Sequence, residues 1–332
     1  MHGVTATRAT HRQPTDQDLV AAARRHTCAD PSRTGLAVVG FWGTTSFQKA
    51  AGLPQEGSPP PLSPPEPGGH GIIAAVSNGT LLQVGQLLRT SPPELIVYDR
   101  STDCPYLSGC VSRLPLRYPV RPLSRSELAH RLAAGDRREG KLLYRPECSG
   151  CTECIPIRLN VDLIRPSRTQ RRTFRKASER LRTELAPVEA DERHVALYNA
   201  HRIGRGLGAP KKVITRDDYE LMFVETCCES FELRYWDDDD LVGVAIVDRA
   251  QDGLSAVYSY YDPDRPGLSL GTYSILKQVE LCRRWGLKYV YLGFYVAEND
   301  HMRYKARFRP NEQLIDGRWQ VIEGVATSLQ PA

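Results

Sequence analysis

The chain contains 332 residues, of which 41% are hydrophobic, 25% charged and 8% aromatic. This composition is that of a globular protein, so it excludes a collagen, a coiled coil and a fully disordered chain. No run approaches eighteen apolar residues, and the first thirty residues lack the apolar core of a signal peptide. The sequence therefore predicts a cytoplasmic protein without membrane contact. Lys and Arg exceed Asp and Glu by 44 − 39 = 5, which indicates nucleic-acid binding only if the charge is locally concentrated.

Residues 1–92 differ in composition from the rest of the chain. Residues 54–67 contain seven prolines in fourteen positions, and such a stretch forms neither a helix nor a strand ladder. The sequence therefore predicts a largely disordered extension with a proline-rich linker over residues 1–92. The alternative interpretation is an extension that is read from an upstream start codon and has no role.

Ordered structure is expected to begin with a strand at residues 95–98, followed by a helix at 124–134. In that helix Ser124 and Glu127 have the spacing of a capping box. Residues 140–161 are expected to alternate between short strands and a cysteine-rich turn. Two further helices are predicted at 167–186, with Ser167 as the cap, and at 191–204.

The second half of the chain is more regular. Its pattern predicts strands at 231–236, 241–247, 254–261 and 288–295, and a helix at 269–285. A strand, a helix and a strand in this order, beside antiparallel strands, predict an α+β (α/β-like) fold with a mixed sheet. The four aspartates at 237–240 indicate either a metal site or a solvated hairpin tip, and the hairpin tip is favoured.

Cys148, Cys151 and Cys154 form two consecutive CxxC steps. Thiolates at this spacing on a tight turn can bind one metal centre. A fourth ligand is needed, for which Cys104 is the first candidate and Cys110 the second. Four thiolates suit structural zinc or an iron–sulfur cluster, and the spacing does not distinguish between them. The alternative is a cluster of reduced structural thiols.

Positive charge is concentrated at residues 165–182, where eight arginines and lysines accompany a single carboxylate, Glu179. A helix with this density of charge attracts a phosphate backbone in a salt-dependent way. Arg168, Arg171 and Arg172 are the residues expected to contact it. The alternative is a solvated helical face.

Two later segments have the composition of a ligand site. The strand at 254–261 leads into the acidic turn 262–264 and then to a helix that starts at Ser269, where free N–H groups can hold an anion or a carbonyl oxygen. The alternative is ordinary strand–turn–helix packing. Residues 303–309 interleave four cations with aromatic residues, which suits contact with RNA or capture of a carboxylate.

Five motifs follow one another in the order YRPECSGCTECIPIR, RPSRTQRRTFRK, SAVYSYYDPD, LSLGTY and MRYKARFRP. Together they resemble the arginyl-tRNA–protein transferase family over roughly residues 94–322. The cysteine pattern is similar to that of the bacterial branch, whose members are typically aspartate/glutamate leucyltransferases, whereas eukaryotic members are arginyltransferases. The resemblance implies an N-terminal cysteine-bearing domain, here 93–186, and a C-terminal N-acetyltransferase-like (GNAT) domain, here 187–325.

The activity implied by the resemblance is the transfer of Leu or Arg from an aminoacyl-tRNA to the N-terminal Asp or Glu of a protein. The product is expected to be an N-degron that directs the protein to degradation, with a downstream protease adaptor as a further partner. No cofactor is required for this transfer because the ester is already activated. An iron–sulfur cluster has been associated with the family's cysteines. Residues 298–301 depart from the bacterial pattern, which often has a cysteine there, so the donor amino acid stays open.

The resemblance also indicates which residues act. The enzyme must align an amine with an ester and stabilise the oxyanion that forms. This work is assigned to the region around Tyr261, Asp262, Ser269 and Tyr273, where Asp262 either accepts a proton from the attacking amine or binds the donor's amino group. The residues expected to contact the acceptor's acidic side chain are Arg158, Lys305 and Arg307.

Two other functions fit the same patterns. One is a non-catalytic module that binds tRNA or a degron, and the other is a cysteine–metal redox sensor that binds nucleic acid. A transfer assay with charged tRNA and an acidic N-terminal peptide distinguishes all three.

Overall fold

The computed structural model describes residues 76–77, 80–81, 86–207 and 213–323. The extension expected at 1–92 lies mostly outside the described residues. Within it, β1 (Val76–Ser77) pairs with β2 (Thr80–Leu81), and ordered structure continues from β3 (Leu87–Leu88). None of the helices in these described ranges is both long and apolar enough to cross a bilayer.

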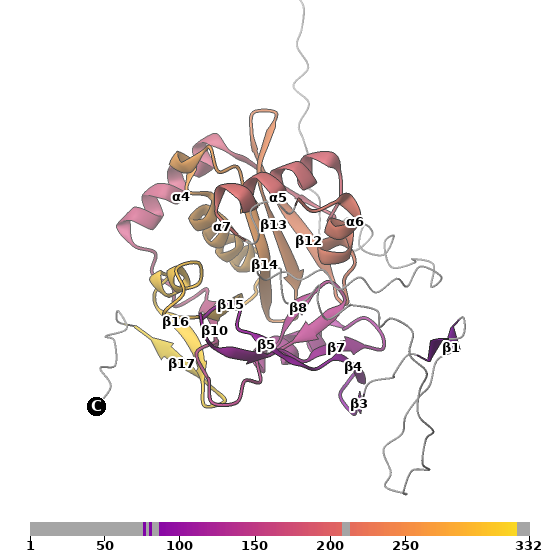
Figure 1. Cartoon of the computed structure of the whole chain (residues 1–332). Coiled ribbons are helices and arrows are strands. Elements are labelled where there is room, and N and C mark those ends of the chain that lie inside the picture. The colour runs from indigo at the N-terminus through magenta and orange to yellow at the C-terminus, as the bar shows by residue number, and fades with distance from the viewer. Residues whose placement is uncertain (1–75, 78–79, 82–85, 208–212, 324–332) are drawn as a thin grey trace, which may run out of the picture.

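An eight-stranded sheet forms the centre of the fold (Figure 1). All of its neighbouring strands are antiparallel except β14 and β15, which are parallel and are joined by α7 (Leu270–Arg284). The predicted mixed sheet and its strand–helix–strand crossover are therefore confirmed. In spatial order the strands are β11 (Arg182–Ala186), β12 (Ser230–Asp237), β13 (Asp240–Arg249), β14 (Gly253–Tyr261), β15 (Tyr289–Tyr295), β10 (Ile155–Asn160), β16 (Asn311–Ile315) and β17 (Arg318–Ile322).

Helices cover both faces of this sheet, because alternate side chains of its strands are apolar on both sides. Phe231, Leu233 and Ala245 face one cluster, which α7 and α4 (Arg168–Arg180) cover. Val244 and Ile246 face the other. That side is covered by α5 (Glu192–Gly204), by α6 (Arg216–Tyr219) and by the single π-helical turn Glu220–Val224 that continues α6.

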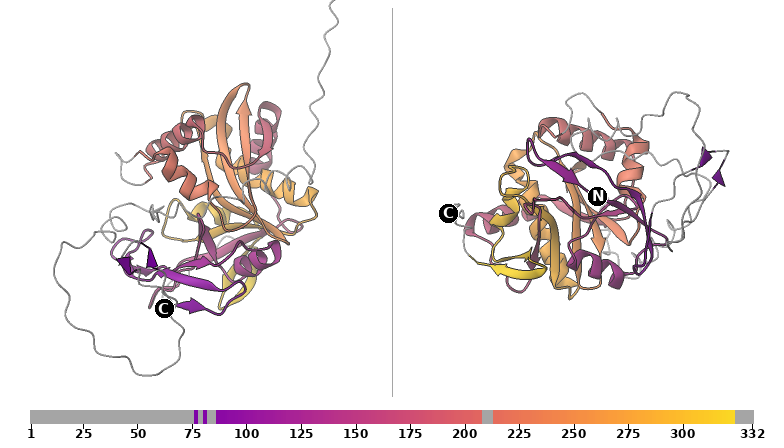
Figure 2. Two further views of the ribbon diagram at one scale, coloured as in Figure 1. Left: turned by 90° about the vertical axis from the view of Figure 1, so that its right-hand side faces the viewer. Right: turned by 60° about the horizontal axis from the view of Figure 1, so that its bottom comes forward.

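A second, five-stranded sheet carries the N-terminal part of the described chain, below the first sheet in the left view of Figure 2. A short hairpin of β5 (Ser101–Asp103) and β6 (Val111–Arg113) and helix α3 (Arg125–Ala133) accompany it. Arg138 links the two sheets, because its Nε and Nη2 donate to the two carboxylate oxygens of Asp248 at 2.8 and 2.7 Å. In spatial order the strands are β3, β4 (Glu94–Tyr98), β7 (Leu116–Pro119), β9 (Leu142–Tyr144) and β8 (Arg137–Glu139).

Local sequence signals predicted where the helices start more accurately than where they end. The capping boxes at Ser124 and at Ser167 are both present, as predicted. The helix expected over 167–186 is shorter, because Leu181 is extended and the next five residues pair with β12. The expected domain boundary at 186/187 therefore falls inside the eight-stranded sheet, to which β10 and β11 also belong.

Candidate functional site

A pocket of about 860 Å³ lies where the two sheets meet. Its walls come from β8, the last turn of α5, the end of β14, the first turn of α7, β15 and the 3-10 helix Arg303–Arg307. Cations outnumber carboxylates among the described residues that line it, so the pocket favours anionic ligands. The cations are Arg137, Arg138, Arg202, Arg205, Arg265, Lys305 and Arg307, and the carboxylates are Glu139 and Asp262.

Three of the four residues expected to act on the ester line this pocket: Tyr261, Asp262 and Ser269. Asp262 holds its own turn together, since one carboxylate oxygen accepts from the Asp264 N–H at 2.9 Å and the other from Arg265 Nε at 3.2 Å. Ser269 has a left-handed backbone, with φ of 48°, and its side chain makes no capping bond. The predicted start of the helix at Ser269 is thus confirmed.

Tyr273 does not reach the pocket. Its ring is buried in the core between α7 and α4, where it stacks on Phe174, and its hydroxyl bonds Thr183 Oγ1 at 2.9 Å. The reason is helical periodicity. Thr272 and Ile275 line the pocket, whereas Tyr273 points to the opposite side of α7, into the core.

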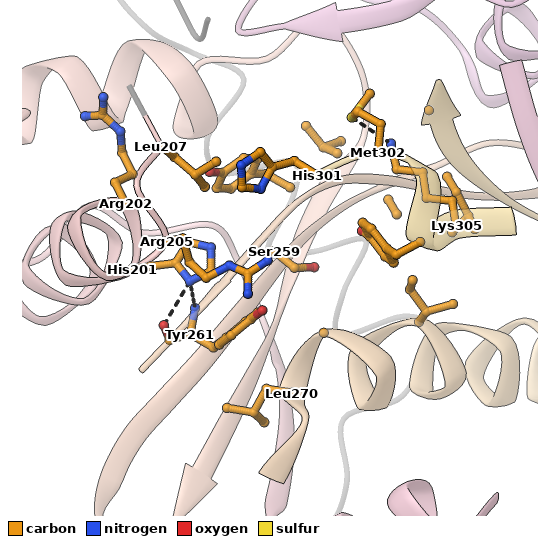
Figure 3. Close-up of a pocket in the computed structure, with 18 of the residues that line it drawn as sticks. His201, Arg202, Arg205, Leu207, Ser259, Tyr261, Leu270, His301, Met302 and Lys305 are labelled. Carbon is orange, nitrogen blue, oxygen red and sulfur yellow. Dashed lines mark hydrogen bonds between the residues drawn. The ribbon is translucent and has the colours of Figure 1, made fainter. Parts of the chain in front are cut away.

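His201 joins the site from α5, where the sequence had given no signal. Its Nδ1 lies 3.0 Å from the carbonyl oxygen and 3.2 Å from the N–H of Tyr261, and its ring packs edge-on against the Tyr261 ring (Figure 3). Burial, followed by the nearby Arg205, lowers the pKa of His201 to about 4. The side chain is therefore a neutral hydrogen-bonding group at physiological pH.

Lys305 is buried in the pocket wall, whereas Arg307 is exposed at its rim. The Lys305 ammonium donates to the Phe294 carbonyl at 2.7 Å and approaches Met302 Sδ at 3.5 Å (Figure 3). Burial, followed by repulsion from Arg137, lowers the pKa of Lys305 to about 7. The structure thus brings two of the three cations expected to bind the acceptor into one pocket.

The third, Arg158, lies elsewhere. It is buried on β10, where its Nε donates to Glu312 at 2.7 Å. Its guanidinium carbon lies 3.6 Å from the ring centre of Tyr289 and 4.1 Å from that of Trp319. Its charge and its faces are occupied by these partners, so the expected contact with an acceptor is not supported by its position.

The basic helix α4 reaches the rim of the pocket at both ends. Near its start, Gln170 donates to the carbonyl of Arg307 at 3.3 Å. At its end, Arg180 pairs with Asp237 at 2.6 Å, and Asp237 also pairs with Arg265 of the pocket. Along the helix, the other exposed cations are Arg168, Arg171, Arg172, Arg175 and Lys176.

The aspartates at 237–240 form the predicted hairpin tip. Strands β12 and β13 pair up to Asp237 and Asp240, and Asp238 has a positive φ of 54°. Asp238, Asp239 and Asp240 are exposed, while Asp237 is buried between its two arginines. Asp237 of the tip thus links Arg180 at the end of α4 to Arg265 of the pocket.

The four predicted metal-binding cysteines are neighbours. Burial first, and then Cys104, Cys148 and Cys151, raise the pKa of Cys154 to about 12. Cys104 and Cys154 pack against a cluster that includes Tyr106, Phe294 and Met302, which line the pocket. Among the described residues, however, no three Cys, His, Asp or Glu side chains converge closely enough to hold a metal ion.

Comparisons with known proteins agree with the sequence motifs. Residues 102–172 match the family model described as "Arginine-tRNA-protein transferase, N terminus", and residues 193–315 match the one described as "Arginine-tRNA-protein transferase, C terminus". The two matches cover the residues that build the pocket from β8 to the 3-10 helix at 303–307.

Two curated bacterial relatives are both named "Aspartate/glutamate leucyltransferase". The protein of Thiobacillus denitrificans is 37% identical over 221 residues, which is 67% of this chain and 92% of the relative. That of Chromobacterium violaceum is 38% identical over 219 residues, which is 66% of this chain and 90% of the relative.

Among solved structures, L-PGS from Bacillus licheniformis has a TM-score of 0.37 at 10% identity, covering 51% of this chain and 58% of that one. So weak a structural likeness carries no argument.

Proposed function

Because the chain belongs to the arginine-tRNA-protein transferase family, we propose that its pocket transfers leucine from charged tRNA to the N-terminal Asp or Glu of a protein. The observation that carries this proposal is the cationic pocket, which suits an acidic acceptor and the phosphates of tRNA. The product is an N-degron, read by a downstream protease adaptor, in the cytoplasm. We also propose that the C-terminal part, residues 187–325, has an N-acetyltransferase-like (GNAT) architecture.

The lining of the pocket favours leucine over arginine as the donor. Leu270, Ile275 and Leu292 supply apolar surface for a leucyl side chain. An arginyl side chain would need a carboxylate. Of the two that line the pocket, Asp262 is engaged by Arg265, and the cations that outnumber Asp262 and Glu139 repel a guanidinium. The names of the curated relatives point to the same donor.

In the reaction the neutral α-amine of the acceptor attacks the carbonyl carbon of the ester. The new C–N bond replaces the ester C–O bond, and a proton from the amine ends on the ribose oxygen that leaves. An α-amine has a pKa of about 7.7–8.0, so a useful fraction is neutral near pH 7. The protein must therefore mainly align the two reactants, which is worth up to roughly 7–11 kcal/mol.

The groups beside the acidic turn supply this alignment. The N–H groups at the start of a helix have no partner within the helix and favour developing negative charge. Leu270 and Gly271 present such groups at the pocket, since the first bonds to Ser269 come from Thr272 and Tyr273. His201 holds the backbone of Tyr261 in place and keeps its ring against the wall of the pocket.

A peptide experiment tests the proposed function. Purified protein is mixed with leucyl-tRNA and a peptide that begins with Asp, and the peptide mass is measured. We expect one added leucine, and no addition to the same peptide with an acetylated α-amine. No addition to the free peptide, or addition to the acetylated one, contradicts the proposal.

The alternatives are a non-catalytic tRNA or degron-binding module and a cysteine–metal redox sensor. Neither is favoured, because the curated relatives are named as transferases over about two thirds of this chain. The same peptide experiment separates them, since neither alternative modifies the peptide.

Helix α4 is proposed to bind the tRNA backbone. Replacing Arg171 and Arg172 with alanine removes two exposed cations and should weaken tRNA binding, with a salt slope smaller by about two. The matched control replaces Arg193 and Arg216, which are exposed on α5 and α6. Binding is measured by fluorescence anisotropy at several salt concentrations. Equal slopes for both double variants would show that α4 is only a solvated face.

The four cysteines are proposed to bind zinc or an iron–sulfur cluster. Their proximity and the CxxC spacing support this proposal, and the transfer chemistry does not need the group. Metal analysis and the visible absorption of anaerobically purified protein measure the metal content and detect a cluster. We expect Cys151→Ser to lower the metal content and Cys282→Ser, a buried thiol of α7, to leave it unchanged. Equal metal content in both variants contradicts the assignment.

A further inference from the structure

Three buried cations form the floor of the pocket, and they differ in what balances their charge. Arg138 pairs with Asp248. Arg137 and Lys305, which are 9% and 8% exposed, form no ion pair within the part of the chain that the structure describes. A buried charge without a counter-ion is costly, so such a pair marks a place where an anion would be stabilised.

Neutral groups hold the Arg137 guanidinium in one orientation. Its Nη1 donates to Ser255 Oγ at 3.1 Å and its Nη2 to the Ala256 carbonyl at 2.7 Å. Gly293 lies against it, since a Cβ there would be 3.4 Å from the Arg137 Nε, and its φ of 88° also favours glycine. These contacts position the guanidinium without neutralising it, and they use two of its five N–H donors.

Arg137 and Lys305 are near enough to repel each other. Burial lowers the pKa of Arg137, and Arg137 in turn lowers the pKa of Lys305. The entry of one carboxylate between them would relieve both effects. A phosphate backbone fits this position poorly, because Arg137 and Lys305 are buried, whereas Arg205 and Arg307 offer exposed cations at the rim.

We propose that Arg137, together with Lys305, binds the side-chain carboxylate of the acceptor's N-terminal Asp or Glu, and that Arg137 thereby determines acceptor specificity. This inference rests on the proposed function. A planar guanidinium can hold a carboxylate bidentately, and an Asn or Gln acceptor would leave the buried charge unpaired. The floor therefore selects the acid over its amide.

The test compares peptides that begin with Asp or Asn as competitors in one transfer reaction. The ratio of their products does not depend on how much of the enzyme is folded. We expect Arg137→Gln to lower the preference for Asp over Asn by about 100-fold. Arg137→Lys keeps the charge but loses the paired N–H donors of the guanidinium, so it should lower the preference less. Arg145→Gln is the matched control, because Arg145 belongs to the same part of the chain, is partly exposed and does not line the pocket.

Binding of charged tRNA to each variant is measured in parallel. We expect an affinity within about threefold of wild type for Arg137→Gln. An unchanged Asp preference in both Arg137 variants overturns the inference, as does a loss of tRNA affinity that accounts for the lost transfer. These outcomes are distinct from failure of the proposed function, in which the wild-type protein itself transfers nothing to the Asp peptide.

Discussion

Replacing Arg138 with methionine should lower the free energy of unfolding by about 3–5 kcal/mol. The Arg138 and Asp248 side chains are 2% and 1% exposed, and they join the five-stranded sheet to the eight-stranded one. Removing the arginine leaves a buried carboxylate whose remaining bond is from Ser230 Oγ at 2.6 Å. Thermal unfolding should shift downward by about 10 °C, given the size of the described chain.

The matched control is Arg121→Met. Arg121 also pairs with a carboxylate, that of Glu127 at 2.7 Å, but the arginine side chain is 54% exposed. An exposed pair of this kind contributes about 0–1 kcal/mol. The double variant Arg138→Met with Asp248→Leu should recover part of the loss, because it removes both buried charges. If Arg138→Met unfolds within 1 °C of the control, the two sheets do not depend on this pair.

The second large effect is a pH dependence of stability that comes from His201. The pKa of His201 is about 4 in the folded protein, whereas its ordinary value is 6.5. Between these values the unfolded chain binds more protons, so acid favours unfolding. The stabilisation is fully present above pH 6.5 and is lost as the pH falls through 6.5 toward 4, by about 3 kcal/mol in total.

His201→Gln isolates this contribution, because glutamine does not titrate. Urea unfolding of both proteins from pH 7 to pH 4 gives the difference in their free energies of unfolding. We expect wild type to lose about 3 kcal/mol relative to the variant over this range. A difference that stays constant with pH would show that His201 is not kept neutral by burial.

Much of the fold follows from local sequence signals. The capping boxes at Ser124 and Ser167 and the apolar runs within β12 to β14 each determine an element through residues a few positions apart. The strand β11 was mistaken for helix because its pairing with β12 depends on residues about fifty positions away. The hairpin of β16 and β17 was missed for the same reason, since β16 joins the sheet through β10.

The site was only partly predictable. Tyr261, Asp262, Ser269, Lys305 and Arg307 stand in two motif-rich segments, and the fold brings these segments together. Tyr273 and Arg158 stand in equally distinctive motifs but pack into cores, which only tertiary contacts reveal. Arg137 and His201 were missed because nothing near them in sequence shows that one lacks a counter-ion and that the other meets the backbone of Tyr261.

Donor competition tests the central claim most directly. The wild-type protein receives equal amounts of leucyl-tRNA and arginyl-tRNA, each with its own label, and a peptide that begins with Asp. Because the pocket joins an apolar wall to a cationic floor, we predict that leucine is added at least about ten times more often than arginine. Equal addition, or a preference for arginine, would contradict the account of this pocket as a leucyl-transfer site.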